Sequence, residues 1–87
     1  MMNVEVVDLR LANGDGKLKA LVSIKFAESL IVRGFSVVEG KKGMIVKLPS
    51  KPTKDGRWVD TIAVDDFLKM EIENKVLDAY ESFLKEA

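Results

Sequence analysis

The side chains in this sequence that could do chemistry are mostly positively charged and gather between positions 41 and 57. Six lysines or arginines stand there against a single acid, Asp55, which gives the segment a local charge of +5. They are Lys41, Lys42, Lys47, Lys51, Lys54 and Arg57. Cations of this kind bind phosphate groups, so Lys51, Lys54 and Arg57, with Lys41 and Lys42 from a neighbouring hairpin, could neutralise several phosphates of a nucleic acid. The alternative is a solvated surface without a ligand.

Trp58 follows the basic segment directly, and two roles are open for it. Its indole could stack on an unpaired base. Large aromatic side chains are more often buried, so we expect Trp58 to be a core residue beneath the loop.

The composition argues against an enzyme. The chain contains no histidine and no cysteine, which removes the usual general base, the usual thiol nucleophile and most zinc sites. Asp65 and Asp66 are better explained as a helix cap, and Glu39–Gly43 lacks the glycine spacing of a phosphate-binding loop. We therefore expect a binding protein without a catalytic residue, cofactor or metal.

The length and composition of the chain predict one small globular domain over residues 1–87. Hydrophobic residues make up 47% of the chain, and no apolar run is long enough for a membrane helix. The N-terminus does not resemble a secretory signal, and there is no cysteine for a disulfide, so we expect a cytoplasmic protein with no membrane partner. The net charge is zero, yet residues 1–64 hold eleven bases and seven acids while residues 65–87 hold three and seven.

Two strands and a turn are predicted at the N-terminal end. Val4–Leu11 reads as a strand whose phase shifts near Val6, so that Val7, Leu9 and Leu11 share one face after a bulge. Residues 13–16 form a turn signal, and the next run alternates cleanly. Its inward positions are Leu18, Ala20, Val22, Ile24 and Phe26.

A second hairpin and a helix follow. Residues 30–38 carry apolar side chains on both faces of the expected strand. One face has Leu30, Val32 and Val38, and the other has Ile31, Phe35 and Val37. This pattern is typical of a strand that is covered on both sides. After a turn at residues 39–43, Met44, Val46 and Leu48 share one face of a strand. The loop at 49–56 is expected to be stiff without being sheet, and residues 57–63 hold a last short strand.

From Asp65 the period becomes that of a helix, with a buried stripe of Leu68, Ile72, Val76, Ala79 and Phe83. The predicted fold is therefore α+β: a twisted antiparallel sheet of about five strands, made of two hairpins and a short strand, with one long C-terminal helix. One helix covers one face of a sheet, and the expected cover for the other is a second copy, joined face to face or by pairing of exposed edge strands, which predicts a homodimer. The alternative is that the N-terminal hairpin folds over that face.

In these residues the chain resembles the SpoVG family of small bacterial proteins linked to septation and sporulation. The matching positions are Val4, Val7, Leu9, Arg10, Asp15 and Gly16 in the first hairpin, the loop motif Pro49–Gly56, and Ile72, Val76 and Tyr80 in the helix. The loop motif is the specific part, although Pro52 stands where the family has arginine.

The resemblance implies a dimeric antiparallel sheet with a C-terminal helix that regulates septation or sporulation programmes by binding DNA and, in some members, RNA. It also implies that the contact is made by Lys51 and Lys54 in the loop and by Lys69 at the start of the helix. The alternative function is a protein-interaction adaptor of the cell-division machinery. Such an adaptor would use the apolar helix start, Phe67, Leu68 and Met70, or a free sheet edge.

Overall fold

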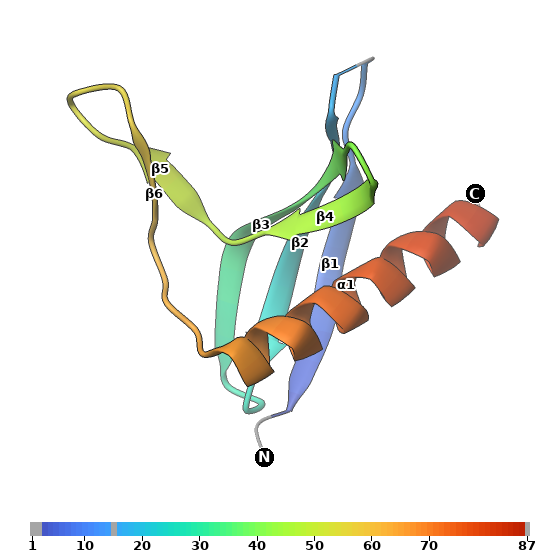
Figure 1. Cartoon of the computed structure of the whole chain (residues 1–87). Coiled ribbons are helices and arrows are strands. Elements are labelled where there is room, and N and C mark those ends of the chain that lie inside the picture. The colour runs from blue at the N-terminus through green and yellow to red at the C-terminus, as the bar shows by residue number, and fades with distance from the viewer. Residues whose placement is uncertain (1–2, 15, 87) are drawn as a thin grey trace.

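The computed structural model describes residues 3–14 and 16–86 and has the predicted α+β architecture (Figure 1). Its elements in chain order are β1 (Val4–Leu11), β2 (Leu18–Phe26), β3 (Leu30–Gly40), β4 (Gly43–Lys47), β5 (Ser50–Pro52), β6 (Trp58–Asp60) and α1 (Asp66–Glu86). The first four strands form an antiparallel sheet in the order β1-β2-β3-β4, and β5 pairs with β6 in a separate two-stranded sheet.

Helix α1 crosses one face of the four-stranded sheet and contacts both edge strands, β1 and β4 (Figure 1). The buried core lies between them and combines residues from β1 to β4 with three from the helix. Its members are Val4, Ala20, Val22, Ile24, Phe26, Phe35, Val37, Val46, Ile72, Val76 and Tyr80. The sheet face turned toward α1 is called the inner face below, and the opposite one the outer face.

The bulge predicted in β1 is present, but it sorts the side chains differently. The pairing with β2 shifts between Val6 and Asp8, so Val7 is the extra residue. Val4 and Val6 already lie on the core side, and the bulge keeps Leu9 there with them. Leu11, opposite Ala20, shares the face of Leu9 as expected but is 39% exposed at the end of the strand, and Val7 is 42% exposed at the bulge, so only Leu9 of the three packs against the core.

A second bulge, at Gly34, was not predicted. Val22 pairs with Phe35 and Ser23 with Arg33, which leaves Gly34 as an additional residue in β3. The insertion exchanges the faces of β3, so Phe35 and Val37 are buried while Ile31, assigned to the same face from the sequence, is 48% exposed. A third shift, next to Leu18, leaves that predicted core residue 41% exposed.

Helix α1 begins as predicted from its capping residue. The Asp65 carboxylate accepts a hydrogen bond of 2.8 Å from the Leu68 amide, which satisfies one of the unpaired donors of the first turn. The buried stripe contains Ile72 and Val76 and then Tyr80. Phe83, expected at the end of this stripe, is 41% exposed, because α1 runs on past the edge strand β1 (Figure 1).

The expectation that β3 is covered on both sides does not hold within one chain. The N-terminal hairpin β1-β2 is part of the sheet and does not fold over it, and α1 covers only the inner face. On the outer face Leu21 and Ile31 are each 48% exposed. Among the residues that the structure describes, no helix is long and apolar enough to cross a membrane.

The β2-β3 turn offers a test of backbone strain. Ala27 and Glu28 both have positive φ angles, 51° and 67°, and the Ser29 amide closes the turn on the Phe26 carbonyl. Non-glycine residues are strained in this region, so Glu28→Gly should raise the free energy of unfolding by about 0.5–1 kcal/mol in urea titrations. Ser29→Gly, next to the strained pair, is the control and should lower it. Equal effects of the two changes would contradict the strain.

Candidate nucleic-acid interface

The β5-β6 hairpin is a separate two-stranded ribbon that projects away from the sheet and helix (Figure 1). Ser50 pairs with Asp60, Lys51 with Val59 and Pro52 with Trp58. The loop expected to be stiff without being sheet therefore contains a strand. Pro52 is compatible with it because both strands of an isolated ribbon are edge strands, where a missing amide donor is tolerated.

A network of hydrogen bonds closes the tip of the ribbon. The Thr53 amide donates to the Arg57 carbonyl at 2.6 Å, and the Thr53 hydroxyl donates to the Asp55 carboxylate. The Arg57 guanidinium forms an ion pair of 3.0 Å with the same carboxylate. Gly56 has a φ of 87°, a conformation that favours glycine. The tip is therefore held in one shape although its side chains are exposed.

The base of the ribbon is fixed to the sheet through Pro49, which is buried. Its carbonyl accepts two hydrogen bonds from Thr61, from the amide at 2.8 Å and from the hydroxyl at 3.1 Å. On the sheet side, Pro49 packs against the Gly34 bulge so closely that a Cβ on Gly34 would lie 3.3 Å from the Pro49 Cβ. These contacts set the direction in which the ribbon leaves the sheet.

The ribbon presents three of the predicted site residues, Lys51, Lys54 and Arg57, all exposed. Asp55 offsets the charge of Arg57 at the tip, and with Asp60 at the base the ribbon, residues 50–60, holds three bases against two acids. Trp58 is 69% exposed, and the expectation of a core residue was wrong. No second layer covers the ribbon in the described part of the chain, so its indole has nothing to pack beneath.

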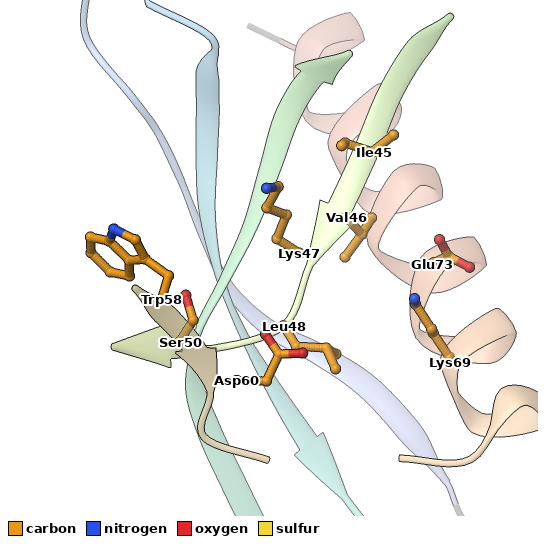
Figure 2. A pocket seen from close by; sticks show the side chains of 9 residues that line it. All are labelled: Ile45, Val46, Lys47, Leu48, Ser50, Trp58, Asp60, Lys69 and Glu73. Carbon is orange, nitrogen blue, oxygen red and sulfur yellow. The ribbon is translucent and has the colours of Figure 1, made fainter. Parts of the chain in front are cut away.

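A hollow of about 480 Å³ separates the ribbon and β4 from the start of α1 (Figure 2). Its walls are residues 45–48, Ser50, Trp58 and Asp60 on one side and Lys69 and Glu73 on the other. Lys69 lies there with the acids Asp60 and Glu73, while the Lys47 side chain projects on the side of β4 away from α1 (Figure 2). The hollow adjoins the free edge of β4.

The predicted site residues do not all meet in one protomer. Lys51, Lys54 and Arg57 share the ribbon, and Lys69 faces the hollow beside it. Lys41 and Lys42 lie in the β3-β4 turn, at the opposite end of β4 from the ribbon (Figure 1). The strand between these ends keeps Lys41 and Lys42 apart from the ribbon, so the predicted site residues do not form a common surface within one chain.

The outer face of the sheet carries further cations, which are not among the predicted site residues. Arg10, Leu21, Ser36 and Lys47 pair in a continuous row across β1 to β4, and Arg33 lies in the neighbouring row opposite Ser23. The grouping of these cations across strands depends on the bulge at Gly34, which was not predicted. Phe67 and Met70 form another exposed group, at 65% and 62%, on the side of α1 away from Ile72.

These features define a class: a small α+β protein with one helix packed on a four-stranded antiparallel sheet and a basic two-stranded ribbon beside it. The chain belongs to the SpoVG family, whose model matches residues 2–82.

Relatives share most of their length with this chain. A protein of Clostridium perfringens strain SM101 is 35% identical over 92% of this chain and 90% of its own length. One of Staphylococcus saprophyticus is 41% identical over 92% and 80%. One of Staphylococcus aureus strain JH9 is 37% identical over 92% and 81%. Each is named "Putative septation protein SpoVG".

The tip network gives a pH prediction. The hydrogen bond from Thr53, supported by the Arg57 guanidinium, holds the pKa of Asp55 below its ordinary value of 3.8. A carboxylate whose pKa is lower in the folded than in the unfolded protein stabilises the tip at pH values above its unfolded pKa. This stabilisation is lost as the pH falls through the folded pKa. The NMR shifts of the Thr53 and Arg57 amides should therefore change only below about pH 3.8. In Asp55→Asn this transition should be absent, and a midpoint above 3.8 would contradict the network.

Proposed function

We propose that this protein is a homodimeric regulator of cell septation that binds nucleic acid, with the β5-β6 ribbon as its contact to duplex DNA. The observation that carries the proposal is the ribbon itself, which projects from the body with Lys51, Lys54 and Arg57 exposed. The link to septation rests on the name that its relatives bear. The absence of histidine and cysteine agrees with a binding role.

The shape of the ribbon suits a duplex. The major groove is about 12 Å wide and admits an α-helix or a two-stranded β-ribbon. Lys51 lies on a strand of the ribbon and Lys54 at its tip, so both can reach phosphates as the ribbon enters the groove. Lys69, at the hollow behind the ribbon, adds a cation on the body side.

The free edge of β4 is the proposed dimer contact. Of the two edge strands, β1 carries the Val7 bulge and the charged residues Glu5, Asp8 and Arg10, which are features that discourage edge pairing. β4 has a regular register with β3 and the apolar residues Met44, Ile45 and Val46. Two β4 strands related by a two-fold axis would continue the sheet and present two ribbons, so the charge offered to one duplex doubles.

Charge reversal in the ribbon tests the nucleic-acid contact. Lys51→Glu combined with Lys54→Glu should abolish binding to duplex DNA at ~50 mM salt, because two phosphate contacts become repulsive, and wild-type affinity should fall as salt rises. Filter binding measures both. The matched control is Lys75→Glu with Lys85→Glu, the same charge change on α1. If the wild type retains neither a duplex nor a single-stranded probe on the filter at low salt, the proposal is refuted.

Sedimentation of variants tests the dimer. Ile45 is the middle residue of β4, so in a symmetric pair it stands opposite its own copy, and Ile45→Lys places two like charges face to face. This variant should sediment as a monomer, whereas Leu21→Lys on the outer face should remain a dimer. Dissociation of Leu21→Lys alone would mean that the outer faces pack together instead.

One observation favours a second candidate, a protein-interaction adaptor of the division machinery. Phe67 and Met70 are exposed at the start of α1 and point away from the core. Exposed apolar groups of this size often mark a protein contact. On this alternative, Phe67→Ser with Met70→Ser would impair septation in cells while leaving DNA binding intact.

A further inference from the structure

The outer face of the sheet is open, and its charge is uneven. On the β1 side the cations have acidic neighbours: Arg10 forms an ion pair of 3.2 Å with Asp8, and Lys25 pairs in register with Glu5. On the β3-β4 side Arg33 and Lys47 are exposed, and no ion pair is formed by either within residues 3–14 and 16–86. The positive potential of this face is therefore concentrated on β3 and β4.

The ribbon adds an aromatic ring to this part of the face. Lys47 and Trp58 border the same hollow, and in Figure 2 both project on the side of β4 away from α1. Arg33 is adjacent to Gly34, the residue against which Pro49 packs at the base of the ribbon. The Gly34-Pro49 contact thus fixes the ribbon, with Trp58, beside the part of the sheet that carries Arg33 and Lys47, although these three residues lie up to 25 positions apart in the sequence.

From this arrangement we infer that the junction between the outer face and the ribbon binds an unpaired strand of nucleic acid. A base stacks on Trp58, and Arg33 and Lys47 hold the phosphates on either side of it, while Leu21, 48% exposed between them and β1, offers apolar surface to a neighbouring base. The inference rests on the proposed binding of nucleic acid but assigns it a second site, made of residues other than Lys51 and Lys54.

Geometry favours an unpaired strand over a duplex at this site. The outer strands of a four-stranded sheet lie roughly 14 Å apart at normal strand spacing, wider than a major groove, so the face cannot enter it. A single strand can spread over a flat face, and its bases are free to stack. A duplex offers Trp58 no free base on which to stack, because the faces of its bases are already stacked on one another.

Charge also decides against a second copy as the occupant of this face. Packing two outer faces together would bury the apolar row Leu18, Val38 and Ile45, but it would also bury Arg33 and Lys47, for which no ion pair is formed within residues 3–14 and 16–86. Burial of unpaired like charges is strongly unfavourable. A polyanion removes this repulsion, which is why the single strand is the better fit.

The single tryptophan makes the inference directly measurable, since all tryptophan fluorescence comes from Trp58. Titration of the full chain with oligothymidylate and with oligouridylate should quench it with saturation. Arg33→Ala with Lys47→Ala should weaken this binding at least tenfold and reduce the salt slope by roughly 0.7 per removed cation. Lys75→Ala with Lys85→Ala on α1 is the matched control and should change neither.

Trp58→Ala, followed by filter binding, should weaken single-strand binding roughly 5- to 100-fold, as is typical for loss of one stacked base. Lys51→Glu with Lys54→Glu should abolish duplex binding but retain quenching by the single strands. Unchanged single-strand affinity in Arg33→Ala with Lys47→Ala, or binding without quenching, overturns the inference and leaves the ribbon proposal standing. Dissociation of the dimer by Leu21→Lys assigns the face to a second copy and also overturns it. Failure to bind any probe overturns both.

Discussion

The arrangement of the proposed binding surfaces depends on the contact between Gly34 and Pro49. A side chain on Gly34 would press on Pro49 at 3.3 Å, and the φ of 102° at Gly34 is itself one that only glycine adopts readily. Thr61 fixes Pro49 from the other side through two hydrogen bonds to its carbonyl. Because the chain leaves the sheet at this point, these contacts decide where the ribbon, its lysines and Trp58 lie relative to β4 and the outer face.

A second constraint comes from the size of the chain. One helix is enough to bury one face of a four-stranded sheet, and α1 does so through Ile72, Val76 and Tyr80. The other face must then be compatible with water or with a partner, and it mixes Leu21 and Ile31 with four cations and two acids. A neutral chain thereby acquires distinct surfaces: an acidic helix, a basic ribbon and a sheet face that is basic along β3 and β4.

Local signals in the sequence were sufficient where the structure depends on neighbours along the chain. The hairpin β1-β2, the inward set from Ala20 to Phe26, the β4 face of Met44, Val46 and Leu48, and the Asp65 cap all follow from alternation, turn residues or capping chemistry. The bulge in β1 was also visible as a break in alternation. The bulge at Gly34 left no break in alternation, because the residues on both faces of this strand are apolar, although an isolated glycine inside a strand is a known sign of a bulge.

The sequence by itself determined the α+β class, the helix with its buried stripe, and a positive charge concentrated between residues 41 and 57. Only the tertiary structure decided which of those charges share a surface. Lys41 and Lys42 are carried to the far end of β4, while Arg33, distant in sequence from the ribbon, is brought to its base. The physical reason is register: each bulge moves the following residues to the opposite face of the sheet, and pairing between strands is a long-range property. Trp58 is exposed for a similar reason, because burial requires a second layer, and the ribbon has none within the described residues.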